Sequence, residues 1–198
     1  YDLHFEENTG KVPVFNPDVR TFEVTNSKTG ELIGLWYLDT FGREGKRSGA
    51  WMNTYRSRAR LLNDNLVLAS NNNNFNKPEP GKPTLLSLDD ASKMFHEFGH
   101  AINYFLVDVK YPSLGGSQRD FVEYPSQVNE NWLLTPEVLQ RFAKHHATGQ
   151  PMPQALVDKI QKAQTFNQGF ATVEYLSSAI VDMKMHMDPN GVADPDAF

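Results

Sequence analysis

The stretch MFHEFGHAINYF, residues 94–105, decides the fold of this chain. Its apolar residues recur at helical spacing and form the faces of one helix: Met94, Phe95, Phe98, Ala101, Ile102 and Phe105. This periodicity predicts an amphipathic helix that begins at a cap formed by Asp89 or Asp90 and ends near Val107. The polar residues inside the stretch are therefore placed on known faces of that helix.

Three of those polar residues form an H-E-x-x-H motif, with His96, Glu97 and His100. Residues four apart share one face of a helix, so both imidazoles can reach a single metal ion. Glu97 stands beside them and can reach a water on that ion, as a general base does. Gly99 weakens a helix, which indicates close packing at this point or room for an incoming chain. The alternative is two surface histidines on an amphipathic helix, but burial among so many apolar residues would then be costly.

Composition limits the other chemistry. The chain has 198 residues, a one-domain length, and no cysteine, so a transition metal must be held by histidines and carboxylates. A net charge of −5 argues against a nucleic-acid binder, and no apolar run is long enough for a membrane span. The chain begins at Tyr1 and ends in an acidic stretch, so we expect a fragment of a longer protein.

The chain is β-rich first and helical afterwards. Thr21–Thr25 alternates with period two, and Glu31–Leu38 follows after a turn cluster, which predicts a hairpin. A third strand is predicted at 66–69. The order predicts an α+β fold in one region, 1–198, with a β-rich part at 1–83 and a helical part at 84–198. Further helices are predicted from Asp120 or Pro125 onward, from Thr135-Pro136, from Pro153 to about Phe166, and from about Ala171 to Met187.

Two polar stretches each allow two interpretations. Asn71–Asn74 is typical of a loop or a strand end, or else belongs to a sheet edge, near Leu68–Asn74, that binds an extended peptide. The basic stretch from Arg43 to Arg60 favours a solvated surface, with capture of an anionic substrate group as the alternative.

A catalytic zinc needs a third protein ligand. The candidates downstream are the His145–His146 pair, whose neighbours suit a solvated face, the distant His186, and carboxylates after the glycine loop. We favour Glu123, with Asp120 near enough to share the role, because a second helix could fold back there onto the first. Glu123, Gln127 and Glu130 then share one face. Glu130 is the predicted acceptor for the other N–H of a ligand histidine, or alternatively an exposed salt-bridge partner.

Two segments, Phe95–Ala101 and Arg119–Trp132, resemble the thimet oligopeptidase family of zinc metallopeptidases, and within it the bacterial peptidyl-dipeptidase branch that includes oligopeptidase A-like enzymes. The resemblance extends along the whole chain, through Asn16–Arg20, Ser48–Met52, Phe166–Phe170 and Leu176–Met185. It implies a helical zincin core in which the H-E-x-x-H helix packs on the Glu123 helix. It also implies one Zn²⁺ per chain on His96, His100 and Glu123, with Glu97 as catalytic base.

The resemblance further implies a hydrolase of short peptides, a peptidyl-dipeptidase or an oligopeptidase, monomeric as the full-length protein. Members of the family are much longer, and a later segment contributes to transition-state stabilisation. We therefore expect this chain to bind zinc but to hydrolyse peptides poorly. Its loop at 110–119 is slightly shorter than in the family.

Two other functions stay open at this point. One is another zincin class, such as an aminopeptidase, although the acidic motif that would recognise a free amine is missing from the sequence. The other is a non-catalytic zinc or peptide-binding module, which would have no use for Glu97. The lack of cysteine favours the cytoplasm, with the periplasm as the alternative.

Overall fold

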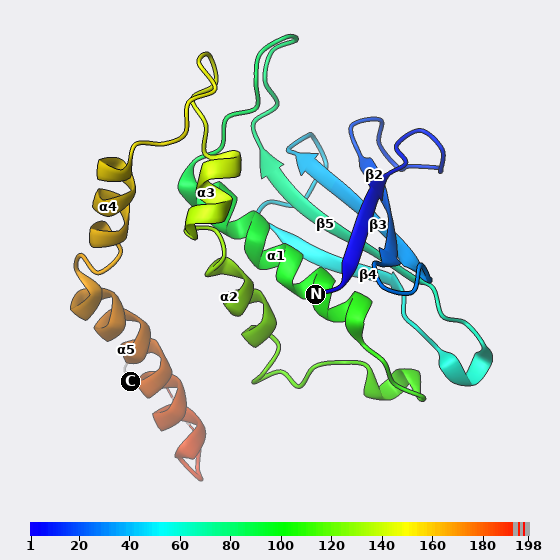
Figure 1. Ribbon diagram of the computed structural model, residues 1–198. Helices are drawn as coiled ribbons and strands as arrows, with labels where there is room; N and C mark the ends of the chain where they lie inside the picture. The colour runs from blue at the N-terminus through cyan, green and yellow to red at the C-terminus, as the bar shows by residue number, and fades with distance from the viewer. Residues whose placement is uncertain (192–193, 195, 197–198) are drawn as a thin grey trace. The chain divides into compact units, whose positions relative to one another are not determined.

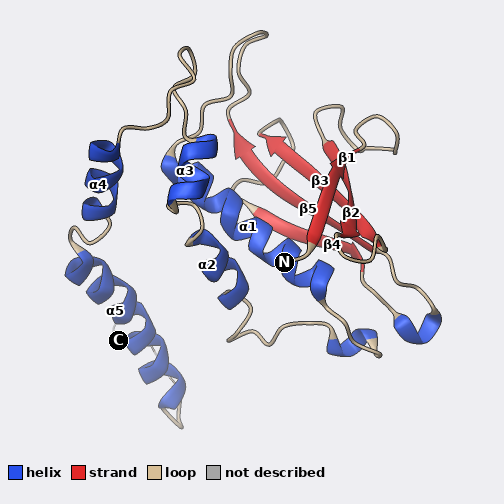
Figure 2. Ribbon diagram, in the orientation of Figure 1, coloured by secondary structure: helices blue, strands red, loops and turns tan. Residues whose placement is uncertain are grey.

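The computed structural model describes residues 1–191, 194 and 196. The chain falls into two compact units, Tyr1–Gly149 and Gln150–Phe198. The first unit contains a five-stranded sheet and three helices (Figures 1 and 2). The second contains two helices. The order of strands first and helices afterwards confirms the predicted α+β class.

The sheet is mixed and has the strand order β1-β2-β3-β5-β4. The strands span Leu3–Glu7 (β1), Arg20–Asn26 (β2), Leu32–Phe41 (β3), Trp51–Arg56 (β4) and Val67–Phe75 (β5). All neighbours are antiparallel except β3 and β5, which run parallel. The hairpin predicted from the two alternating runs is confirmed as β2 and β3. The sequence patterns missed the short strands β1 and β4.

The asparagine run occupies the C-terminal part of β5, so of the loop or strand end expected there, the strand end is observed and the loop is wrong. The alternative of a sheet edge at 68–74 is also wrong, because β3 and β4 pair with β5 on either side. The carboxamides of Asn71, Asn72 and Asn74 bond to groups around the strand, whereas neither carboxamide atom of the fully buried Asn73 has a hydrogen-bond partner among the described residues. Asn72, on the face turned away from α1, donates to the backbone oxygen of Trp51, and Asn74 donates to the backbone oxygens of Arg47 and Gly49.

One helix, α1 (Leu88–Leu106), packs across the sheet, as Figure 1 shows. The buried residues between them are aliphatic and aromatic: Val24, Ile33, Val67, Ala69, Ala101 and Phe105. The Phe98 ring packs against Trp36 of β3 at a tilt of 44°, with ring centroids 4.8 Å apart. This core holds α1 on the sheet, with the H-E-x-x-H motif near its middle.

The other helices of the first unit are short. They are α2 (Tyr124–Glu130), which packs against α1, and α3 (Pro136–Phe142), and two 3₁₀ turns lie at Arg60–Leu62 (η1) and Pro112–Leu114 (η2). The helix predicted near Asp120 or Pro125 therefore begins at Tyr124, and the one predicted at Thr135-Pro136 begins at Pro136. In the second unit, α4 (Gln154–Ala163) and α5 (Gln168–Met187) agree with the predicted helices to within a few residues.

The basic stretch is mostly exposed, as expected for a solvated surface, and Lys46 is the clearest exception. The Lys46 side chain is only 3% exposed and its ammonium bonds to the Asp39 carboxylate and to three backbone oxygens, among them that of Asn73. Arg43 bonds to the same carboxylate, and Arg56 pairs with Asp64. Burial leaves the Lys46 ammonium without water, so it bonds to internal acceptors, whereas the Arg43 and Arg56 side chains remain 32% and 45% exposed.

None of the described helices is both long and apolar enough to cross a membrane.

Candidate metal centre

The motif helix begins at Leu88, about two turns before His96, the first of the candidate metal ligands. Ser87 is its N-cap and forms a capping box with Asp90, whose carboxylate accepts from the Ser87 backbone N–H. The predicted cap at Asp89 or Asp90 is therefore displaced to Ser87, and Asp90 is the reciprocal partner. From there α1 runs without interruption through the motif.

The structure brings the three expected ligands together. The His96 and His100 rings lie on one face of α1, with centroids 5.0 Å apart. Glu123, the residue just before α2, reaches both rings with one oxygen: its Oε2 is 3.0 Å from His96 Nε2 and 3.2 Å from His100 Nε2. Their ligand atoms lie within 4.8 Å of one another.

These distances fit a zinc ion. Two ligand atoms that each lie 2.0–2.1 Å from zinc at a tetrahedral angle are about 3.3 Å apart. The two observed separations, 3.0 and 3.2 Å, are close to that value. Two imidazole nitrogens and one carboxylate oxygen leave a fourth position open, which is the donor set of catalytic rather than structural zinc.

Glu130, in the last turn of α2, approaches His96 from the other side of its ring. Its Oε1 lies 2.6 Å from His96 Nδ1. A carboxylate there can accept a proton from Nδ1, which would leave the lone pair of the imidazole on Nε2, the nitrogen that faces Glu123. The contact is compatible with both predicted roles of Glu130, an orienting partner of His96 or a salt-bridge partner, and the Glu130 side chain is 36% exposed.

Glu97 is buried, with 8% of its surface exposed, although it lies between two partly exposed histidines. Burial raises the pKa of its carboxyl above the ordinary value, and the nearby His96 opposes that shift. Burial also lowers the pKa of His100. A raised pKa lies closer to neutral pH, and a group that acts first as general base and then as general acid works best when its pKa is near the working pH.

Gly99 is a packing requirement. A Cβ at this position would lie 2.7 Å from Ser126 Cα, 2.8 Å from the Pro125 backbone oxygen and 2.9 Å from Asn129 Cβ. Of the two interpretations of this glycine, close packing is thus the one observed. The contact brings α2, with Glu130 inside it and Glu123 just before it, directly against the motif helix.

Sequence patterns missed two buried polar residues of α2, one that contacts Glu123 and one that contacts α1. Ser126 is fully buried and its hydroxyl donates to the Glu123 backbone oxygen at 2.7 Å and to Oε2 at 3.0 Å. Asn129 is buried and donates to the backbone oxygen of Phe95 at 2.7 Å. The sequence does contain a signal for Ser126: it lies three residues after the predicted ligand Glu123, the spacing at which a serine hydroxyl can bond back along a helix.

The other metal-ligand candidates take no part in this group. His145 and His146 stack on each other and are exposed. His186 lies in α5 of the second unit, exposed, with its Nδ1 3.3 Å from Asp182. Asp120 is exposed and lies outside the His96, His100 and Glu123 group.

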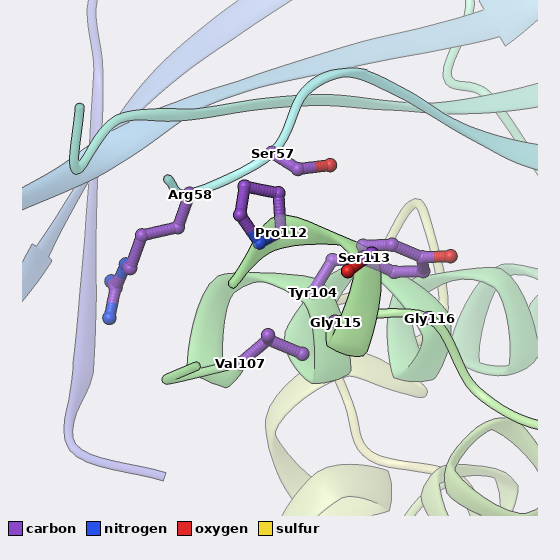
Figure 3. Close-up of a pocket in the computed structure, with 8 residues that line it drawn as sticks. All are labelled: Ser57, Arg58, Tyr104, Val107, Pro112, Ser113, Gly115 and Gly116. Atoms are coloured by element: carbon purple, nitrogen blue, oxygen red, sulfur yellow. The ribbon is translucent and has the colours of Figure 1, made fainter. Parts of the chain in front are cut away.

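A pocket of about 300 Å³ adjoins the C-terminal part of α1 (Figure 3). Tyr104 lines it and stands four residues after His100, so the two side chains share one helical face. Ser57, directly after β4, lines the pocket from the sheet, and the η2 loop lines it with Pro112, Ser113, Gly115 and Gly116. The pocket thus lies between the end of β4, an edge strand of the sheet, and the face of α1 that carries the histidines.

Comparison with known proteins identifies the family of the chain. The model of peptidase family M3 matches residues 1–194. A dipeptidyl carboxypeptidase of Salmonella typhimurium is 40% identical over 185 residues, which cover 92% of this chain and 27% of that protein. An oligopeptidase A of Escherichia coli is 36% identical over 182 residues, 89% of this chain and 27% of that protein. An organellar oligopeptidase A of Arabidopsis thaliana is 34% identical over 195 residues, 94% of this chain and 24% of that protein.

The chain belongs to peptidase family M3, in agreement with the resemblance seen in its sequence. It spans about a quarter of the length of these relatives.

Proposed function

We propose that this chain is the zinc-bearing catalytic region of a peptidase that hydrolyses short oligopeptides. The observation that carries the proposal is the convergence of His96, His100 and Glu123 at distances that fit one zinc ion, with Glu97 buried beside them. Membership in peptidase family M3 and relatives named dipeptidyl carboxypeptidase and oligopeptidase A support it.

The roles of the residues follow from their positions. Zinc held by His96, His100 and Glu123 would polarise the scissile carbonyl and lower the pKa of a bound water. The Glu97 carboxylate takes the proton of the attacking water and passes it to the leaving amine. Its raised pKa favours this two-way transfer, because the protonated acid is then easier to form. Glu130 holds His96 in the tautomer that leaves Nε2 free.

We propose that the peptide lies along β4. Among the described strands, β4 pairs only with β5, so its other edge offers backbone N–H and C=O groups. An extended peptide can add to such an edge as a further strand. The pocket at Ser57 and Tyr104 lies where β4 ends, and is the place for a substrate side chain or terminus.

The metal site is tested by zinc titration of the 198-residue chain. We expect one Zn²⁺ per chain, loss of binding in His96→Gln and His100→Gln, and unchanged binding in the control His146→Gln, whose ring is exposed and outside the group. A wild-type chain that binds no zinc, or a His146→Gln variant that alone loses it, contradicts the proposal.

Glu97→Gln separates catalysis from metal binding. We expect this variant to keep one zinc and to lose peptide hydrolysis by at least about 100-fold, because the general base is removed. The relatives are about four times as long as the chain, so we propose that it works within a longer polypeptide, and hydrolysis is measured there. Hydrolysis at wild-type rate by Glu97→Gln would show that another group is the base.

Glu130→Ala tests the orienting contact. Loss of such a partner commonly weakens metal affinity about 10–100-fold. We expect a rise of that size in the zinc Kd, measured by competition with a chromophoric chelator. The control is Glu137→Ala, an exposed glutamate of α3, which should leave the Kd unchanged.

A non-catalytic zinc or peptide-binding module is the second candidate, and Glu97→Gln decides against it when hydrolysis is lost. Product mapping on a peptide ladder distinguishes release of C-terminal dipeptides from internal cleavage. Three further points stay predictions. Cell fractionation tests the cytoplasmic location, sedimentation tests whether the full-length protein is a monomer, and a turnover assay tests the weak activity of the isolated 198-residue chain.

A further inference from the structure

The buried amide of Asn71 links the sheet to the motif helix. Asn71 lies in β5 with 1% of its surface exposed. Its Nδ2 donates to the backbone oxygen of Glu97 at 2.6 Å, and its Oδ1 accepts from the indole Nε1 of Trp36 at 2.6 Å. A polar side chain from the middle of the sheet thus contacts α1 at the residue expected to be the base.

The orientation of this amide is determined by its partners. An indole N–H can only donate and a backbone oxygen can only accept. The carboxamide oxygen of Asn71 must therefore face Trp36 and its NH₂ group must face Glu97. A flipped amide would lose both bonds, so the donor to α1 is held in one direction.

A second buried amide, on α2, donates a hydrogen bond to the same helix. Asn129, 4% exposed, donates through Nδ2 to the backbone oxygen of Phe95 at 2.7 Å. Phe95 and Glu97 are two residues apart, so their carbonyl groups project about 200° apart around the helix axis. The two amides thus hold α1 from nearly opposite sides, and the metal-binding residue His96 lies between the two bonded carbonyls.

We propose that Asn71 and Asn129 are positioning residues for the metal centre, an inference that rests on the proposed zinc site. The two histidines are on α1, whereas Glu123 and Glu130 are at the two ends of α2. Apolar packing alone leaves α1 free to slide or rotate slightly on the sheet, because it is not directional. Two amide hydrogen bonds stop that movement. They fix α1 against β5 and against α2, and so fix the distance from the histidines to Glu123.

Zinc affinity of the folded chain tests this, because metal sites tolerate only small displacements of their ligands. Asn71→Leu keeps the size of the side chain and removes the donor. The matched control is Asn72→Leu, a neighbour in β5 that is 3% exposed and bonds to Ser70 and the Trp51 backbone oxygen on the other face of the sheet. Both variants lose a buried amide, but only one amide contacts α1. Asn129→Leu tests the α2 side.

The readouts are the zinc Kd by chelator competition and the free energy of unfolding in urea with zinc removed. We expect Asn71→Leu and Asn129→Leu to raise the zinc Kd about 10–100-fold. Asn72→Leu should lose stability to a similar degree and keep the Kd within about threefold of wild type. A merely structural role would lower stability in all three variants and leave the three Kd values alike.

The inference is overturned by a folded Asn71→Leu that binds zinc as tightly as wild type, or by an Asn72→Leu that weakens binding equally. If Asn71→Leu does not fold, Asn129→Leu decides by the same criterion. A wild-type chain that binds no zinc is a different result, because it removes the proposed function and not only the role of the two amides.

Discussion

Gly99→Ala tests whether the close approach of α1 and α2 determines the metal centre. The added Cβ would lie 2.7 Å from Ser126 Cα and 2.8 Å from the Pro125 backbone oxygen, both on the backbone of the α2 segment. Ordinary contact begins at 3.4 Å, so α2 must move by about 0.7 Å. Neither atom belongs to a flexible side chain, and a shift of the helix is the only relief.

The size of the effect follows from two opposing contributions. Alanine is better than glycine inside a helix by about 1 kcal/mol. Overpacking of a close interface costs about 1–3 kcal/mol. Because the clash is with backbone, we expect the upper part of that range and a net loss of about 1–2 kcal/mol in the free energy of unfolding. A 0.7 Å shift also exceeds the roughly 0.2 Å tolerance of metal–ligand distances, so the zinc Kd should rise at least about tenfold.

The assay is urea unfolding of the zinc-free chain together with chelator competition for zinc. Gly169→Ala is the matched control, because Gly169 also lies in a helix, α5, and an added Cβ there meets nothing within 4 Å. It should leave the zinc Kd unchanged and keep or slightly raise the stability. A Gly99→Ala chain as stable as wild type, with unchanged zinc affinity, would refute the reasoning.

Two further predictions concern charged groups. Lys46→Met leaves Asp39, which is 1% exposed, with one cation fewer and should lower the free energy of unfolding in urea by about 3 kcal/mol. The control Lys28→Met removes an exposed ion pair and should lower it by under about 1 kcal/mol. Equal losses in the two variants would contradict the internal role of Lys46. The hydrogen bond from Arg20 lowers the pKa of Glu7 to about 2, so this pair stabilises the fold fully above the ordinary pKa of 4.5, and the contribution is lost as the pH falls towards 2. Carboxyl NMR titration should find that low value and its return towards 4.5 in Arg20→Gln; an unchanged pKa in the variant would assign the shift to another cause.

The sequence determined the features that depend on local spacing. The motif helix follows from the period of its apolar residues, and the shared face of His96 and His100 follows from their separation of four. The β2–β3 hairpin follows from two alternating runs around a turn. Each of these depends on residues that are close along the chain, where the geometry of a helix or a strand is known in advance.

Only the tertiary structure decided features that depend on distant partners. Asn71–Asn74 has the composition of a loop, yet it is an interior strand, because Trp36 and the Glu97 backbone provide partners for the Asn71 amide. The basic stretch has the composition of a surface, yet Lys46 is buried because Asp39 and backbone oxygens surround it. Polar composition predicts exposure only when no internal partner exists. Sequence separation does not show where such partners lie.

The metal centre combines both kinds of information. The two histidines and Glu97 follow from the motif alone. The sequence favours Glu123 among several candidates only if a second helix folds back onto the motif helix. The structure shows how the second helix packs on the first. Gly99 lets α2 approach α1, and Ser126 bonds to the Glu123 carboxylate, which lies within reach of both histidines. A local motif supplies the ligand types, but the third distance depends on how two helices pack, and packing is set by the whole core.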